Sequence, residues 1–276
     1  METGIILAIL ASLSWATNDI FNKKSILKGY DENFILWIRF PISTLITLPL
    51  GIYYWKVSFN LLLSTFLWLP LEIAGSIFFI KAIKVSPISE VMPFLSFIPV
   101  FSLVGGIFML REEVDIYGAL GILLIISGSF IITGGSFTNI FTIKKGILYM
   151  LISAFCFGIN VPVGKFAIIS SNPYFFTWYY CLVMSVGLLP FLRGREILNA
   201  KNYENVYILP IGLLFSLGGI LYNIALSLSP SPYISAVERT AIIFSIVYGK
   251  IFFGEKVKKS FAGSILMILG VLLIVF

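Results

Sequence analysis

The feature that most constrains this chain is a succession of apolar runs, each long enough to cross a bilayer. A transmembrane helix needs about 20 consecutive, predominantly apolar residues, and we count ten such runs. Lipid offers the backbone no hydrogen-bond partners, and the runs do not alternate as the strands of a membrane barrel would, so we expect helices. The runs cover approximately residues 4–22, 33–54, 62–81, 87–110, 115–134, 146–166, 173–192, 206–227, 232–253 and 260–276.

The composition supports an all-α integral membrane protein and argues against several other classes. Charged residues make up 12% of the chain, about half of what a soluble domain carries. The chain has no histidine, the commonest metal ligand and general base, and no GxxxxGK phosphate loop. Cys156 and Cys181 lie within apolar runs and are interpreted as small buried residues. We therefore expect no catalytic residue, no metal and no cofactor, and we expect lipid rather than nucleic acid as the surroundings.

The basic residues predict an orientation. Of the 19 Lys and Arg residues, 14 lie in the odd-numbered connections between runs and three lie at the other end of the helices. Lys and Arg accumulate in cytoplasmic loops. The count predicts a multi-pass protein of the cell membrane with both termini outside.

The second half of the sequence repeats the first. Residues 82–114 align without a gap on residues 225–257 at a shift of 143, which pairs Ser86-Pro87 with Ser229-Pro230. Residues 14–23 align on residues 156–165 at a shift of 142. Five helices written twice place the second copy in the membrane upside down, an arrangement that in transporters puts the substrate between the halves. We expect repeats at 1–134 and 146–276, joined by a loop at 135–145.

Each half resembles an EamA domain of the drug/metabolite transporter superfamily. The residues that carry the resemblance are SLSWATN (12–18), WIRFPIS (37–43), AIKVSPISEVMPFLSFIPVF (82–101), LREEVDIYGALGILLIISG (110–128) and FGEKVKKSFAGSILMILG (253–270). The resemblance implies ten helices in two inverted five-helix halves, and the transport of small metabolites, often amino acids outward. Two features depart from it. Members usually keep their termini cytoplasmic, and Tyr180 stands where the first half has Arg39.

Ionisable residues inside the apolar runs are candidates for function, because a charge in the bilayer is costly unless it faces a cavity or a partner. Polar and aromatic residues that share a helix face with them extend the set. The candidate cavity residues are Trp15, Asn18, Asp19, Arg39, Glu72, Glu90, Asn160, Tyr222, Asn223, Glu238 and Arg239. The competing interpretations are structural ion pairs and polar contacts that only hold helices together.

Roles follow from the chemistry of these groups. Arg239 could hold a substrate carboxylate, and Glu72 or Glu238 could take up a proton, because burial disfavours the charged form of a carboxyl group. Glu238 and Arg239 are neighbours on a predicted continuous helix, where they would diverge by about 100° and not face each other. We expect Glu72 near Arg239, and Arg39 near Glu238 or Glu90.

The sequence thus predicts a secondary transporter, acting as a monomer or homodimer, that moves a small polar or amphipathic metabolite by alternating access. An amino acid or a related compound, moved outward, is the expected substrate. The alternatives are a flippase for lipid-linked substrates, a membrane-embedded enzyme and a structural subunit. Short connections and the lack of histidine disfavour the enzyme.

Overall fold

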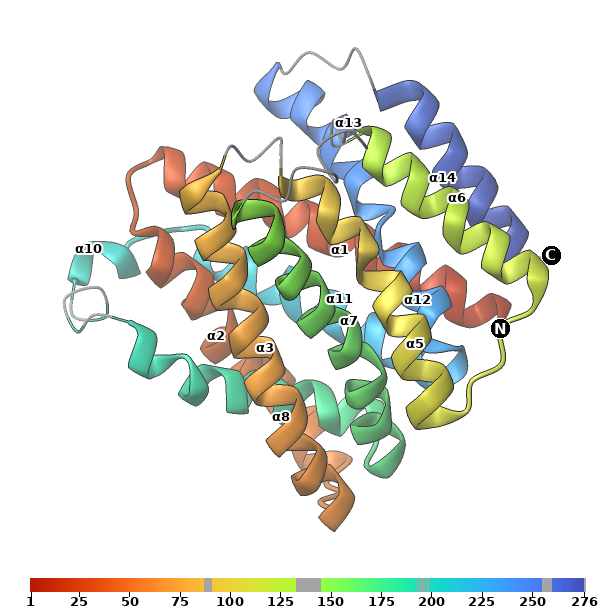
Figure 1. Cartoon of the computed structure of the whole chain (residues 1–276). Coiled ribbons are helices and arrows are strands. Elements are labelled where there is room, and N and C mark those ends of the chain that lie inside the picture. The colour runs from red at the N-terminus through yellow and green to blue at the C-terminus, as the bar shows by residue number, and fades with distance from the viewer. Residues whose placement is uncertain are drawn as a thin grey trace.

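The computed structural model describes residues 1–86, 91–132, 145–192, 194, 197, 199–254 and 260–275, and within them it contains helices and no strands (Figure 1). The helices of the first half are α1 (Glu2–Leu27), α2 (Glu32–Tyr53), α3 (Phe59–Val85), η1 (Met92–Phe97), α5 (Ile98–Leu110) and α6 (Ile116–Ile132). Those of the second half are α7 (Lys145–Ser170), α8 (Pro173–Gly187), η3 (Leu189–Phe191), α10 (Ala200–Tyr203), α11 (Ile208–Leu228), α12 (Ser231–Glu238), α13 (Ala241–Phe253) and α14 (Ser260–Val275).

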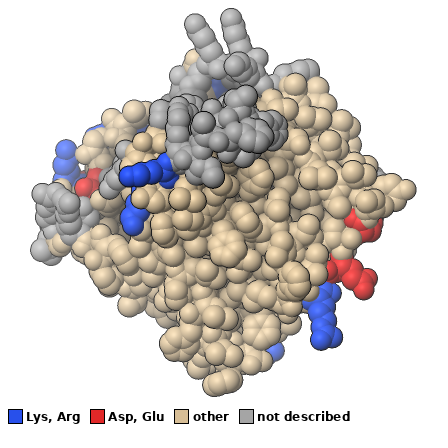
Figure 2. Space-filling model, in the orientation of Figure 1, with Lys and Arg blue, Asp and Glu red and all other residues tan. Residues whose placement is uncertain are grey.

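The helices have the length and surface of membrane spans. Six stretches of the described chain, in α1, α2, α3, α7, α8 with η3, and α11, are long and apolar enough to cross a bilayer. Three shorter apolar helices cover Phe94–Leu110, Ile116–Ile131 and Ala262–Val275. On the face shown in Figure 2, a broad surface without charge separates charged residues at the upper left from those at the right and lower edges. The chain is a multi-pass membrane protein, and ten spans stays a prediction.

Helices of one half pack mainly against helices of the other. α1 packs against α11 and α13, and α7 packs in the same way against α3 and α5. α2 contacts α8, and α6 contacts α14. α6 and α14 lie especially close. A Cβ added at Gly121 would lie 2.6 Å from the carbonyl oxygen of Gly270, and a Cβ added at Gly270 would lie 2.6 Å from the carbonyl oxygen of Gly121.

Two runs expected as continuous helices, 87–110 and 232–253, are interrupted in the structure. A 3₁₀ segment, η1, precedes α5, and the turn at Arg239–Thr240 separates α12 from α13. The spacing of 143 relates the pieces, since α5 begins at Ile98 and ends at Leu110 while α13 begins at Ala241 and ends at Phe253. Each helix is then closed by a left-handed residue, Arg111 or Gly254. Continuous hydrophobicity predicts a span but contains no signal for a break in its hydrogen bonds.

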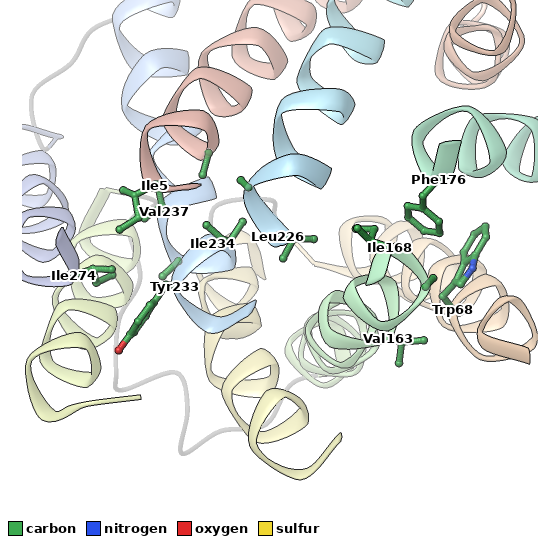
Figure 3. Close-up of a cluster of buried hydrophobic side chains, with 14 of the residues drawn as sticks. Ile5, Trp68, Val163, Ile168, Phe176, Leu226, Tyr233, Ile234, Val237 and Ile274 are labelled. Atoms are coloured by element: carbon green, nitrogen blue, oxygen red, sulfur yellow. The ribbon is translucent and has the colours of Figure 1, made fainter. Parts of the chain in front are cut away.

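One end of the bundle is closed by apolar packing. We call it the terminal face, because α1 begins and α14 ends there (Figure 1). Figure 3 shows side chains from α1, α11, α12 and α14 gathered at this end. Ile5, Leu226, Ile234 and Val237 are each no more than 2% exposed. This packing leaves little space for water between the helices near the terminal face.

Candidate functional site

A cavity of about 1150 Å³ lies between the two halves of the chain. Ten of the eleven candidate residues named from the sequence line it, and the eleventh, Glu90, lies outside the described residues. The ten come from α1, α2, α3, α7 and α11, from the last residue of α12 and from the turn that follows it. They are Trp15, Asn18, Asp19, Arg39, Glu72, Asn160, Tyr222, Asn223, Glu238 and Arg239.

The cavity extends from the middle of the bundle toward the face opposite the termini. Its lining includes Asp31 at the start of α2 and Phe191 at the end of η3, both on that opposite face. Toward the terminal face it ends at Ile168 and Leu226, which are 1% and 2% exposed. A molecule would therefore enter and leave the cavity through the face opposite the termini.

Glu72 on α3 is bound by residues of the other half. The amide of Asn160 donates to its Oε2 at 2.7 Å, and the hydroxyl of Tyr180 donates to its Oε1 at 3.2 Å. These bonds join α3 to α7 and α8 along the wall of the cavity. The expected contact between Glu72 and Arg239 is not among the ion pairs of the described chain.

Glu238 and Arg239 face each other, so the expectation that they diverge is wrong. The Arg239 Nη2 to Glu238 Oε1 distance is 2.6 Å. α12 ends at Glu238, and the turns that follow use bonds to the third residue back, such as Arg239 N–H to the Ala236 carbonyl. Where the helix stops, the two long side chains both extend into the cavity and meet there.

Arg39 on α2 has aromatic neighbours. Its guanidinium carbon lies 4.8 Å from the ring centroid of Phe40 and 4.8 Å from that of Phe215. Within the part of the chain that the structure describes, it makes no hydrogen bond and no ion pair, and its Nε is buried without a partner. Arg39 was expected near Glu238 or Glu90: no ion pair with Glu238 is present, and Glu90 lies outside the described residues.

The remaining candidates combine lining and structural roles. Asn18 is 2% exposed, and its amide donates to the Ile211 carbonyl at 2.6 Å, which ties α1 to α11. The amide of Asn223 donates to Thr177 Oγ1 at 2.9 Å. Asp19 accepts a weak bond of 3.5 Å from Asn22. Trp15 and Tyr222 are tilted against each other, with ring centroids 5.1 Å apart.

Sequence reasoning missed several aromatic residues of the wall. Trp68 and Tyr180 line the cavity with ring centroids 5.3 Å apart, and Phe176 and Phe215 lie on the same lining. In a chain with 26 phenylalanines an aromatic residue carries little signal. The repeat offered a clearer signal for Tyr180, because Tyr180 occupies the position of Arg39 in the first half.

A second group of charges lies at the terminal face, and the sequence did not single it out. Lys165 Nζ lies 2.6 Å from Glu112 Oε1 and donates to the Ser229 carbonyl, also at 2.6 Å. Glu112 accepts from the backbone N–H of Ser231 at 3.0 Å and from its hydroxyl at 3.1 Å. We call Glu112, Lys165, Ser229 and Ser231 the terminal cluster. It joins α7, the segment after α5 and the start of α12.

No metal centre follows from these carboxylates, since the described residues contain no group of three His, Cys, Asp or Glu placed to hold an ion. The site offers instead aromatic faces, the Glu238–Arg239 ion pair, the guanidinium of Arg39 and three further carboxyl groups, those of Asp19, Asp31 and Glu72. Such a lining can bind an organic molecule of modest size by stacking, hydrogen bonds and charge.

Comparison with known proteins agrees with this architecture. The chain is similar over 98% of its length to a protein of Archaeoglobus fulgidus described as an uncharacterized transporter, with 22% identity over 283 residues and 97% of the relative covered. A solved crystal structure shares the fold at a TM-score of 0.69 and 13% identity, covering 98% of this chain and 96% of the other. The model of the EamA-like transporter family matches residues 2–134 and again residues 144–276. The chain therefore belongs to the EamA-like transporter family, and it is a membrane transporter of the drug/metabolite transporter type.

Proposed function

We propose that the protein is a secondary transporter that carries a small polar or amphipathic metabolite through the cavity between its halves. The observation that carries this proposal is the lining itself, in which polar side chains of both halves face one space inside an apolar bundle. Ionisable groups at that depth are costly unless they face a cavity or a partner, which makes this lining a candidate substrate pathway. A site between halves is where transporters built from repeats bind their substrates.

The halves act as inverted repeats of five helices, residues 1–134 and 146–276, joined by residues 135–145. Three observations support this arrangement. The family model matches the chain twice, α1 contacts α11 and α13 as α7 contacts α3 and α5, and the interrupted helices break at a spacing of 143. Broken helices beside the substrate are common in transporters of this design.

Alternating access moves the substrate. In the structure the cavity reaches the face opposite the termini, and the terminal face is closed by apolar packing and the terminal cluster. If the charge bias sets the orientation, the termini lie outside the cell membrane and the cavity receives its substrate from the cytoplasm. Export of an amino acid or a related compound is the proposed direction and class. Glu72 or Glu238 is the proposed site of proton coupling.

Flux through reconstituted protein tests the proposal. Purified protein in liposomes is expected to move members of a labelled panel of amino acids, organic acids, nucleosides and amines. Glu72→Gln is expected to reduce that flux and its response to an imposed pH gradient. Glu204→Gln, at an exposed position after α10, is the matched control and is expected to leave both unchanged. The absence of flux and binding across the whole panel would overturn the transporter proposal for small metabolites.

A further inference from the structure

The charged groups of the cavity differ in how fully they are bonded. Arg239 has Glu238 at 2.6 Å, and Glu72 accepts bonds from Asn160 and Tyr180. Arg39 is the exception. Among described residues nothing accepts a hydrogen bond from it, whereas Arg239 is bonded to Glu238 through its Nη2; the Nε atoms of both arginines are buried without an acceptor. A guanidinium carries five N–H donors, and those of Arg39 have no acceptor within the described chain. A ligand that enters the cavity with an acceptor group would give them a partner.

The surroundings of Arg39 leave its donors available while fixing its position. Phe40 and Phe215 each lie 4.8 Å from the guanidinium carbon and attract the cation through their ring faces. Rings satisfy the charge in part but accept no conventional hydrogen bond from the N–H groups. The side chain is therefore held by its neighbours and keeps free donors inside the cavity.

The nearby acidic groups do not take up these donors. Asp19 and Glu72 interact electrostatically with Arg39, but neither is within the 4 Å of an ion pair. Glu72 is engaged by Asn160 and Tyr180 on both carboxylate oxygens. A carboxylate brought by a ligand would bind Arg39 without breaking any hydrogen bond between described residues of the site, whereas a carboxylate on Arg239 would compete with Glu238.

We propose that Arg39, and not Arg239, binds the substrate's anionic group, and that this group is a carboxylate on a small molecule with an apolar or aromatic body. The inference rests on the proposed function and names its substrate class. The planar fork of an arginine matches a carboxylate through two parallel bonds. Aromatic lining residues such as Trp68, Phe176 and Tyr180 offer surfaces for the body of the molecule.

Three probes of one shape test the inference: 3-phenylpropionate, its primary amide and 3-phenylpropylamine, with inorganic phosphate as a second anion. Binding to purified full-length protein is measured by calorimetry and thermal shift. The acid is expected to bind about tenfold or more tighter than the amide, as a charge-assisted bond would give. Arg39→Gln is expected to reduce this ratio to about one, and Arg39→Lys to leave an intermediate ratio. Arg239→Gln tests the competing anchor, and the preference for the acid is expected to persist in this variant.

The outcomes separate this inference from the transporter proposal. An acid preference that persists in Arg39→Gln, or that is lost only in Arg239→Gln, overturns Arg39 as the anchor. Phosphate binding in place of the acid overturns the carboxylate class. Flux of neutral or cationic compounds without binding of any acid overturns the inference and leaves the transporter proposal standing. If Arg39→Gln does not fold, the intermediate ratio of Arg39→Lys decides, since a purely structural arginine would leave the ratio unchanged.

Discussion

Lys165 and Arg39 are both cations inside the helix bundle, and their surroundings differ. Lys165 is 9% exposed and has a carboxylate and a backbone carbonyl at 2.6 Å. Arg39 has two aromatic rings and, in the described chain, no acceptor. A buried charge that is bonded to two other segments of the chain holds those segments together, and removing its partner is costly. A buried charge with free donors beside a cavity is placed to receive a partner that comes and goes.

The difference follows the direction of the cavity. The terminal cluster lies where the bundle is closed, and it links α7 to the start of α12. Arg39 lies where the cavity is open toward the opposite face. The alignment that relates the halves pairs Lys165 with Lys23 and Glu112 with Glu255, and Glu255 lies outside the described residues. The following variants test whether the terminal cluster serves to close the terminal face while the cavity around Arg39 serves to bind a ligand.

The largest expected effect comes from removing one member of the terminal cluster. Lys165→Met leaves Glu112 buried with its charge uncompensated, which costs about 3–5 kcal/mol. Thermal or denaturant unfolding in detergent measures this loss. The double variant Lys165→Met/Glu112→Gln is expected to recover part of it, because no unpaired charge is left. A double variant that is the sum of its single variants would show that the pair does not act as a unit.

A smaller loss is expected where α6 meets α14. Gly121→Ala places a methyl group 2.6 Å from the Gly270 carbonyl oxygen, so the backbones must move apart. Overpacking of this kind costs about 1–3 kcal/mol. Gly164→Ala is the control, since a Cβ there meets nothing within 4 Å, and its stability is expected to stay close to that of the parent. Equal stability of both variants would mean that the two helices are not held at this distance.

Within the cavity, Tyr180→Phe removes one of the two bonds to Glu72 and keeps the ring. The 3.2 Å bond from Tyr180 is longer than the 2.7 Å bond from Asn160, so we expect a loss of about 0.5–1.5 kcal/mol. Asn160→Leu is expected to destabilise the protein more, because it removes the shorter bond. Unfolding midpoints of the two variants give the comparison. A larger effect of Tyr180→Phe would reverse the ranking and make Tyr180 the main partner of Glu72.

The sequence predicted the helical membrane fold and ten of the residues that line the cavity, but not the contacts between them. Asp19, Glu72 and Arg239 were predicted to face a cavity because each is a charged residue inside an apolar run, where a charge facing lipid is costly. The structure places all three on the cavity wall. The ion pair between Glu238 and Arg239 could not be predicted from the sequence. It depends on the end of α12 at Glu238, and the apolar run continues through that position without a sign of the break. The packing of Phe215 on Arg39 depends on contact between α2 and α11, segments that only the fold brings together.

The smallest effect is expected for the pair that the sequence made most conspicuous. Arg239 and Glu238 side chains are 16% and 21% exposed, against 11% and 7% for Lys165 and Glu112. Water in the cavity screens the first pair and can solvate either charge when its partner is removed. A double-mutant cycle with Arg239→Gln and Glu238→Gln is therefore expected to give a coupling of about 0–1 kcal/mol, well below that of the terminal cluster. A coupling as strong as that of Lys165 and Glu112 would mean that water does not reach Arg239 in the cavity. The contrast between the tightly bonded terminal cluster and a cavity open to ligands would then fail.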